Sequence, residues 1–364
     1  MKKSDYKATN LLFKYGTKIF LTPLTWLYGA ITDIRNFLYD RSILTTTATK
    51  QFSVVVGNLT VGGTGKTPMV EYLLSLLRGN EKIVTLSRGY GRRSRGFVLA
   101  EPNSTADQIG DEPLQYYKKF GNLSKVAVCE DRVEGSKRLF ELYPDHPLLL
   151  LDDAFQHRPL KPDVAIVLND FNRPFYEDEP FPAGRLRERR HGIRRADAII
   201  TTKCPNHLSG VERSLIIQQI KKYSKPETPI FFSGVKYGQP RNFDGSQLPI
   251  QKVRVVVGIA EPLPFINYVR ERYAVVDVKV YSDHYNYTKE DIEKVIRERN
   301  GDEIIMTTEK DMVKLLPFAQ KAKVMPNFAY IPIEVDFGED KDPFLNWLHH
   351  TITMPLQERS MGIH

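Results

Sequence analysis

A glycine-rich loop between an apolar run and a helical pattern constrains this 364-residue chain more than any other feature. Residues 57–68 read GNLTVGGTGKTP, after the apolar run Ser53–Val56 and before a helical pattern over Pro68–Leu77. A strand, a glycine loop and a helix in this order form a phosphate-binding loop, in which backbone N–H groups and the helix N-terminus face phosphate oxygens. We therefore expect a P-loop α/β fold.

The polar residues of this loop each have an expected role. Lys66 is expected to reach the β- and γ-phosphates of a nucleotide, and Thr67 to offer its hydroxyl to Mg²⁺. The usual pattern has glycine five residues before Gly65, where this chain has Thr60, so the neighbouring glycines are expected to make the bend. The predicted nucleotide contacts are Thr60, Val61, Gly62, Gly63, Thr64, Gly65, Lys66 and Thr67.

A second nucleotide motif follows about 80 residues later. Residues 148–153 read LLLLDD, which is the apolar strand ending in a carboxylate that P-loop enzymes use to hold Mg²⁺. Asp152 is the predicted metal ligand, and Asp153 adds a second acid. No guanine-reading NKxD stands late in the domain, which favours ATP as the nucleotide.

Short apolar runs alternate with helical patterns along most of the chain. The runs are continuously apolar, as in strands buried on both faces of a parallel sheet, so the predicted fold is a doubly wound α/β domain. The alternation resumes after a stretch rich in Gly, Pro, Asn and Ser at 234–251, which predicts a second, smaller α/β domain. The predicted segments are an N-terminal amphipathic helix at 1–46, a P-loop core at 47–235 and a C-terminal domain at 236–364.

Composition limits the partners and the chemistry. Lys and Arg exceed Asp and Glu by 52 − 44 = 8, and the pI is about 9.2, which suits a nucleotide, a nucleic acid or an anionic membrane surface. The two cysteines, Cys129 and Cys204, form no CxxC, so no cysteine metal site is predicted and a reducing compartment is expected.

The N-terminal segment carries a basic amphipathic pattern. Residues 1–50 hold eight basic and three acidic residues, and no run reaches the ~18 apolar residues of a membrane span. A helix of this kind either lies in a membrane interface or docks on the protein's own core, and the pattern alone does not choose. The apolar stripe is Phe20, Leu24, Leu27, Tyr28, Ile31, Ile34 and Leu38.

An ordered set of short motifs makes the chain resemble the tetraacyldisaccharide 4′-kinases of lipid A biosynthesis. The set extends from about Leu24 to Lys314, and its GRLRE and SRGYGR elements are far more specific than a P-loop. One departure is Ala154-Phe155, where the family often has Gly-Leu after the two acids. The motifs are GNLTVGGTGKTP (57–68), SRGYGR (87–92), GDEP (110–113), EDR (130–132), LDDAFQHR (151–158), PAGRLRE (182–188), GIAEP (258–262), SDH (282–284) and TTEKD (307–311).

The resemblance implies an activity and a location. It implies transfer of the ATP γ-phosphate to the 4′-hydroxyl of a tetraacyldisaccharide 1-phosphate, giving lipid IVA, with Mg²⁺ as cofactor. It also implies a monomeric enzyme without a nucleic-acid partner at the cytoplasmic face of the bacterial inner membrane. The N-terminal helix would contact the membrane, which favours the interfacial interpretation of 1–46.

The resemblance also assigns roles to single residues. Asp111 corresponds to the proposed catalytic base and His284 to its partner from the second domain, so closure of the two domains is expected to gate the reaction. Arg132 is expected near the γ-phosphate or the acceptor. Arg187 and Glu188 are assigned to the active site, Glu188 beside the metal.

Other polar residues have two interpretations. Gln156 and His157 follow the two acids and could orient ligands there. The basic sets could bind phosphate groups of the acceptor or form solvated faces, with equal weight. These sets are Arg88, Arg92, Arg93, Arg95, Arg189, Arg190, Arg194 and Arg195.

Two other functions remain open on the residues alone. A kinase of a soluble metabolite would keep the phosphate loop but have no use for an apolar basic N-terminus. A nucleotide-switch or partitioning ATPase would suit the basic charge, but aromatic residues are not interleaved with the basic clusters as single-strand binding requires.

Overall fold

The computed structural model describes residues 3–77, 82–246 and 250–360, with side chains from residue 21 onward. The chain divides into two compact units, each made from separate stretches of sequence. The first comprises 1–66, 151–234 and 337–364, and the second comprises 67–150 and 235–336. The segment boundaries expected at 46/47 and 235/236 stay a prediction.

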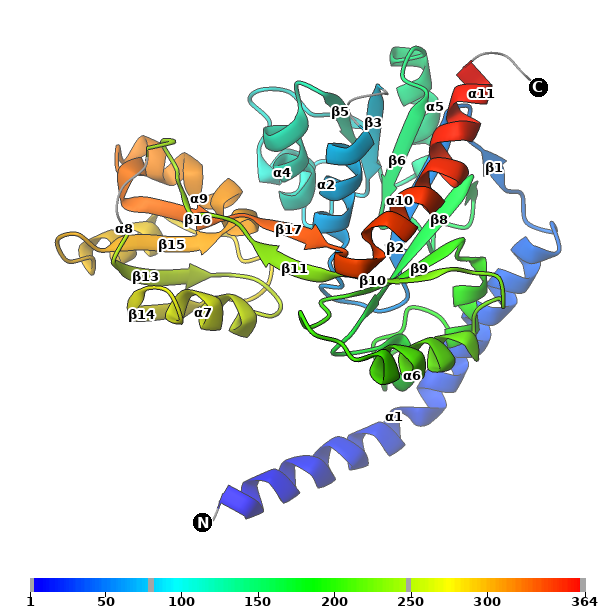
Figure 1. Ribbon diagram of the computed structural model, residues 1–364, viewed down its shortest axis with the longest axis horizontal. Coiled ribbons are helices and arrows are strands. Elements are labelled where there is room, and N and C mark those ends of the chain that lie inside the picture. Colours follow the sequence, from blue (N-terminus) through cyan, green and yellow to red (C-terminus); the bar gives the residue numbers. More distant parts are fainter. Residues whose placement is uncertain (1–2, 78–81, 247–249, 361–364) are drawn as a thin grey trace. The chain divides into compact units, whose positions relative to one another are not determined.

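The first unit is built on a parallel sheet whose strands are buried on both faces. Its strand order is β10-β9-β8-β2, with every pair parallel (Figure 1). Every residue of β2 and β8 is buried, because apolar side chains leave both faces. The strands are β1 (Thr47–Ala48), β2 (Phe52–Asn58), β7 (Leu160–Lys161), β8 (Val164–Asp170), β9 (Ala198–Thr202) and β10 (Ile230–Phe232).

Helices of three kinds complete the first unit. The long N-terminal helix α1 was expected from its apolar periodicity, whereas the C-terminal helices gave no clear pattern. The helices are α1 (Lys3–Asp40), α6 (Gly210–Lys221), α10 (Lys341–Leu348) and α11 (Met354–Ser360), the 3₁₀ helices η1 (Phe175–Glu177), η2 (Arg190–Arg195) and η4 (Gly338–Asp340), and the π-helix η5 (His349–Thr353).

The second unit holds a parallel pair of strands from the P-loop half of the chain. β3 (Ile83–Ser87) and β5 (Ser124–Val128) pair in parallel, and β4 (Val98–Leu99) adds an antiparallel edge to β5. β6 (Leu148–Asp152) carries the chain from the second unit into the first. The helices of this half are α2 (Lys66–Leu77), α3 (Ala106–Ile109), α4 (Asp111–Phe120) and α5 (Arg132–Leu142).

A five-stranded sheet forms the rest of the second unit. Its order is β12-β16-β15-β13-β14, parallel except for β12 against β16. Strand alternation divides its core. Val253, Val255 and Val257 pack toward α7, whereas Val256 packs toward α8 and α9. The strands of this sheet are β12 (Arg241–Asn242), β13 (Lys252–Val257), β14 (Ala274–Val280), β15 (Ile304–Thr308) and β16 (Phe328–Ile331). A separate two-stranded sheet is made by β11 (Gly234–Tyr237) and β17 (Ile333–Asp336). The helices are α7 (Leu263–Arg270), α8 (Lys289–Arg297), α9 (Glu309–Lys321) and the 3₁₀ helix η3 (Met325–Asn327).

A proline divides the apolar run Phe328–Val335 into two strands. The run forms β16 and β17 with Pro332 between them. Proline has no backbone N–H to donate to a ladder, so the strand is interrupted there. The Pro332 carbonyl instead accepts a hydrogen bond from the Gly238 N–H at 2.9 Å.

A buried aspartate joins the C-terminal helices to the sheet of the first unit. Asp340 accepts a hydrogen bond from the Phe232 N–H at 2.6 Å on one oxygen and from Arg213 at 2.6 Å on the other. Phe344 of α10 is fully buried, and its ring centroid lies 5.3 Å from that of Phe231. Both polar and apolar contacts therefore attach residues after 337 to the edge strand β10.

We predict that Asp340→Ala lowers the free energy of unfolding by about 2–4 kcal/mol, because it leaves a buried strand N–H and a partly buried guanidinium without this acceptor. Urea denaturation of the purified chain measures it. Asp342→Ala, at an exposed site in the next turn, is the matched control and should stay within about 0.5 kcal/mol of the wild type. Equal midpoints for both variants would contradict the role of Asp340.

Candidate active site

The phosphate loop follows β2 with the backbone that its sequence requires. Gly62 and Gly65 have φ angles of +117° and +87°, a region that side-chain-bearing residues rarely adopt. A Cβ added at Gly62 would meet nothing within 4 Å, so the surface of the loop is open there. Gly62 thus makes the bend that the absence of glycine at position 60 left to its neighbours.

Side chains behind the loop fix its shape. Asn58, the last residue of β2, donates to the Thr64 hydroxyl at 2.8 Å, and Lys66 Nζ lies 3.4 Å from the Asn58 side-chain oxygen. The Thr202 hydroxyl, at the end of β9, donates to the Thr64 carbonyl at 2.8 Å. Asn58 and Thr202 were not among the predicted site residues, although they end β2 and β9, and sites in parallel sheets form at the C-terminal ends of strands.

The two consecutive acids lie beside this loop. The Asp153 N–H donates to the Val56 carbonyl at 3.0 Å, which places the end of β6 next to that of β2. Gly57 cannot carry a side chain, because its Cβ would lie 2.5 Å from that of Phe155. Asp153 accepts from Arg187 at 2.7 Å and lies 3.7 Å from Lys66 Nζ, while Asp152 is buried. The predicted residues Lys66, Asp153 and Arg187 therefore form one cluster.

The segment with the GRLRE motif is joined to the loop by its backbone. The Val61 N–H donates to the Arg185 carbonyl at 2.8 Å, and the Arg187 N–H donates to the Leu59 carbonyl at 2.8 Å. These bonds flank an antiparallel bridge between Thr60 and Leu186. Thr60 thus holds the Arg-rich segment against the start of the phosphate loop.

Glu188 lies at the centre of a polar cluster with no solvent exposure. Its carboxylate accepts hydrogen bonds from Asn36 of α1 at 2.7 Å, from Arg195 at 2.7 Å and from Gln156 at 3.1 Å. Burial raises the pKa of Glu188, but the charge and hydrogen bond of Arg195 outweigh it and hold the pKa below its ordinary value. The carboxylate is thus committed to these three donors, and its assignment beside a metal stays a prediction.

The basic residues of the site divide by their contacts. Most are paired: Arg189 with Asp33, Arg190 with Glu179, Arg195 with Glu188, Arg92 with Glu130 and Arg93 with Asp107. Arg88, Arg95 and Arg194 are exposed. Arg132 is buried at the start of α5 and donates to the Glu130 carbonyl at 2.7 Å, so it belongs to the second unit.

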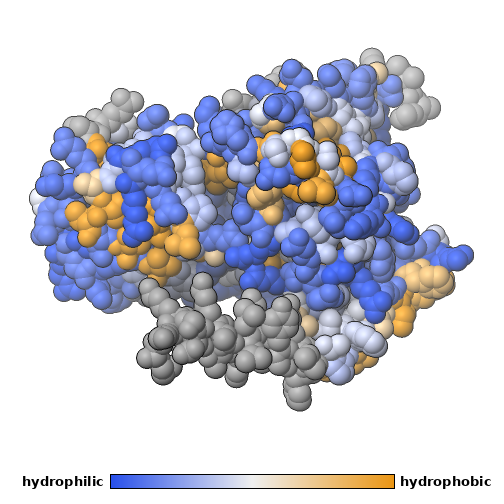
Figure 2. Space-filling model, turned by 60° about the horizontal axis from the view of Figure 1, so that its bottom comes forward, coloured by the Kyte–Doolittle hydropathy of each residue, from blue (hydrophilic) through white to orange (hydrophobic). Residues whose placement is uncertain are grey.

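In the part of α1 whose side chains are described, from residue 21 onward, the buried side chains are polar and the large exposed ones are apolar. Thr25, Thr32 and Asn36 face the protein, and the Thr25 hydroxyl accepts from the Ala183 N–H at 3.0 Å. The exposed face of the helix forms part of the apolar surface at the lower right of Figure 2. Its residues, each more than half exposed, are Leu24, Trp26, Leu27, Ile31, Ile34 and Phe37. The structure does not bury this face on the protein's own core. No helix among the described residues is long and apolar enough to cross a membrane.

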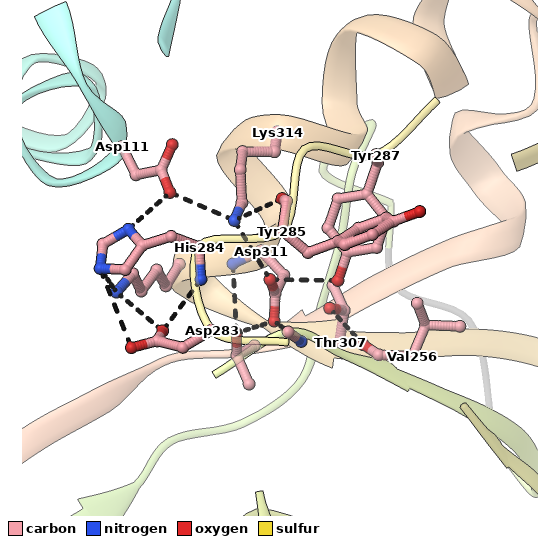
Figure 3. A network of polar contacts seen from close by, with 12 residues as sticks. Asp111, Val256, Asp283, His284, Tyr285, Tyr287, Thr307, Asp311 and Lys314 are labelled. Atoms are coloured by element: carbon pink, nitrogen blue, oxygen red, sulfur yellow. Dashed lines mark hydrogen bonds and ion pairs between the residues drawn. The ribbon is translucent and has the colours of Figure 1, made fainter. Parts of the chain in front are cut away.

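The predicted Asp111–His284 pair is formed within the second unit. Asp111 begins α4 and is 7% exposed, and His284 follows β14. His284 Nδ1 lies 3.2 Å from Asp111 Oδ2, and Lys314 Nζ lies 3.2 Å from the same oxygen (Figure 3). Burial raises the pKa of Asp111, but the hydrogen bond from His284 and the charge of Lys314 outweigh it and lower the pKa. The sequence reasoning did not assign a role to Lys314.

The donor set fits a nucleotide phosphate and Mg²⁺. Two carboxylates, Asp152 and Asp153, and the hydroxyl of Thr67 are the oxygen ligands that this ion prefers, and Mg²⁺ usually keeps water and phosphate as its other ligands. No cluster of three or more His, Cys, Asp or Glu capable of holding a metal by themselves occurs in the described part of the chain. The assignment of Thr67, Asp152 and Asp153 to Mg²⁺ stays a prediction.

We predict that Glu188→Gln destabilises the chain by about 2–4 kcal/mol at pH 7, because Arg195 loses its buried counter-charge. A lowered pKa contributes stability above the ordinary value of 4.5 and loses it as the pH falls through the folded value. The difference between variant and wild type should therefore shrink below about pH 4.5 in urea titrations. Glu179→Gln, whose carboxylate is half exposed, is the matched control. A difference that does not vary with pH would contradict this assignment.

Comparison with known proteins identifies the family to which this chain is similar. Residues 17–353 match the family model described as tetraacyldisaccharide-1-P 4′-kinase. The tetraacyldisaccharide 4′-kinase of Cytophaga hutchinsonii is 41% identical over 90% of this chain and 94% of its own. That of Bacteroides thetaiotaomicron is 38% identical over 90% of each chain. The crystal structure of LpxK from Aquifex aeolicus in complex with ATP superposes with a TM-score of 0.72 at 27% identity, covering 92% of this chain and 99% of the other. The chain belongs to the tetraacyldisaccharide-1-P 4′-kinase family.

Proposed function

We propose that this chain transfers the γ-phosphate of ATP to the 4′-hydroxyl of tetraacyldisaccharide 1-phosphate, giving lipid IVA in lipid A biosynthesis. The observation that carries the proposal is a phosphate loop and a partly buried Asp111–His284 pair in a chain that matches this family over almost all its length. The name of the family gives the phosphate acceptor, and the phosphate loop suits ATP as the phosphate donor.

Each group of site residues has its own role in phosphoryl transfer. The loop glycines and Lys66 bind the phosphates, and Arg187 adds a fixed positive charge beside Asp153. Asp152, Asp153 and Thr67 would hold Mg²⁺, which neutralises the charge of the phosphate oxygens when bound. Asp111 accepts the proton of the attacking hydroxyl, and His284 holds its carboxylate in place.

We further propose that α1 brings the enzyme to its acceptor at the cytoplasmic face of the inner membrane. Six apolar side chains on one face of α1 are exposed, whereas Thr25, Thr32 and Asn36 are buried against the protein. An acceptor with four acyl chains lies in a bilayer, and an exposed apolar helix face gains free energy by entering the interface. A kinase of soluble metabolites has no use for such a face.

We predict that Lys66→Ala abolishes transfer of labelled γ-phosphate to tetraacyldisaccharide 1-phosphate in detergent micelles. Asp111→Asn should lower kcat by about 10²–10⁴-fold with little change in KM for ATP, because it removes the base but not the phosphate loop. Lys289→Ala, a largely exposed residue on α8, is the control and should keep wild-type activity.

Two outcomes would redirect the proposal. Label on a soluble sugar but not on the lipid would favour the soluble-metabolite kinase. ATP turnover that is independent of any acceptor would favour the nucleotide-switch alternative.

We predict that replacing Trp26, Leu27, Ile31 and Ile34 together by Ser reduces sedimentation with anionic phospholipid vesicles by at least about 10-fold. Turnover of acceptor in detergent should survive, because the buried polar contacts of α1 are unchanged. Val211→Ser with Leu215→Ser, two exposed sites on α6, is the control and should sediment as the wild type does. Equal sedimentation of all three proteins would rule out α1 as the contact.

A further inference from the structure

Two lysines of α9 face the Asp111–His284 pair from one side. Lys310 and Lys314 are four residues apart, so both lie on the same face of the helix. Lys310 Nζ lies 3.1 Å from His284 Nε2, and Lys314 Nζ lies 3.2 Å from Asp111 Oδ2 (Figure 3). Each partner of the pair therefore has its own ammonium group.

The position of Lys310 determines where the proton of His284 resides. An ammonium group has three N–H donors and no acceptor, so at 3.1 Å the Nε2 atom must accept. A neutral imidazole that accepts at Nε2 carries its proton on Nδ1, and Nδ1 faces Asp111 Oδ2 at 3.2 Å. An imidazolium would instead point a second positive donor at Lys310, which costs free energy at this separation.

The surroundings keep Lys310 charged. Burial alone lowers its pKa, but Glu112, Asp283 and Asp111 outweigh burial and raise it. Glu112 Oε1 and Asp283 Oδ1 lie 3.6 Å and 3.5 Å from Lys310 Nζ. A charged Lys310 is the state that the tautomer argument requires.

Lys314 determines which oxygen of Asp111 is available. Its side chain is 5% exposed, and its ammonium donates to the Tyr285 carbonyl at 3.0 Å while it holds Asp111 Oδ2. His284 uses that same oxygen. Among the described residues, none donates a hydrogen bond to Asp111 Oδ1, and in Figure 3 this oxygen points away from the network. Oδ1 is thus the atom left for an incoming hydroxyl.

We propose that Lys310 and Lys314 are positioning residues of the phosphoryl-transfer site. Lys310 holds His284 as the neutral Nδ1–H tautomer, which donates to Asp111. Lys314 also contacts Oδ2, so Oδ1 is the oxygen that receives the proton of the acceptor hydroxyl. The consequence for catalysis rests on the proposed function, whereas the tautomer of His284 is a property of the chain itself.

The test compares Lys310→Met with the wild type by two readouts. In full-length protein with ¹⁵N-labelled histidine, the wild type should show His284 with a protonated Nδ1 and an unprotonated Nε2, assigned by the loss of its signals in His284→Gln. In Lys310→Met imidazolium should appear, because Nδ1 still donates to the Asp111 carboxylate and Nε2 can then carry a proton toward Asp283 Oδ2, 3.9 Å away. kcat should fall by about 10-fold or more with KM for ATP unchanged, since the phosphate loop is intact.

Matched variants separate this role from a structural one. Lys310→Arg keeps a donor without an acceptor and should restore the Nδ1–H pattern. Lys321→Met removes an exposed lysine from the last turn of the same helix and should leave both readouts unchanged. Lys314→Met should lower kcat while His284 keeps its tautomer; if its buried contacts make it fail to fold, the Lys310 variants carry the test.

The outcomes distinguish the two proposals. An Nε2–H tautomer or imidazolium in the wild type, or an unchanged His284 pattern in Lys310→Met, would overturn the role of Lys310. An Nδ1–H tautomer that depends on Lys310, in a protein that transfers no phosphate to the lipid, would uphold this arrangement and refute the proposed function instead.

Discussion

The parallel pairing of strands is the constraint on which both groups of site residues depend, those around the phosphate loop and those around Asp111 and His284. In the first unit Asn58 of β2 pairs in register with Leu168 of β8, which pairs with Ile200 of β9, so the C-terminal ends of these strands meet at one edge. The phosphate loop, Asn58 and Thr202 lie there because each follows or ends such a strand. Parallel sheets place binding groups at this edge in general.

The same constraint organises the second unit through one buried aspartate. Gly258 follows β13, His284 follows β14 and Thr308 ends β15. Asp311, with no solvent exposure, accepts from the Gly258 N–H at 2.9 Å, the Thr308 hydroxyl at 2.8 Å and the Tyr287 hydroxyl at 3.1 Å. These bonds fix the first turn of α9 against the strand ends, and the lysines of that helix are thereby directed at Asp111 and His284.

Polarity is distributed differently on α1. A helix that covers a core normally buries its apolar face, but α1 buries two threonines and an asparagine. Thr25 accepts from the Ala183 N–H and Asn36 donates to Glu188, whereas the Thr32 hydroxyl donates to the Gly29 carbonyl of the helix itself. Polar groups are buried without loss only when they are hydrogen-bonded, and the Arg-rich segment supplies two of these partners. Leu24, Leu27, Ile31 and Ile34 of the predicted apolar stripe are consequently exposed, whereas Tyr28 and Leu38 are half-buried and Phe20 lies outside the residues whose side chains are described.

The sequence by itself determined the local elements and the phosphate loop. Glycines with positive φ, a strand before them and a helix after them are short-range features, so Gly62, Gly65 and Lys66 could be assigned directly. The pairing of Asp111 with His284 came from resemblance, because residues 173 positions apart carry no local sign of contact. The TTEKD motif was recognised, yet Lys310 and Asp311 within it received no role.

Only the tertiary structure decided which partners the charged side chains have. The resemblance assigned Glu188 to the site beside the metal, which stays a prediction, and the fold supplies its partners Asn36, Arg195 and Gln156. Whether an arginine is paired, which face of α1 is buried, and which oxygen of Asp111 remains accessible depend on segments far apart in the chain. Local propensity and periodicity report on neighbours in sequence, whereas hydrogen-bond partners and burial are set by packing between distant segments.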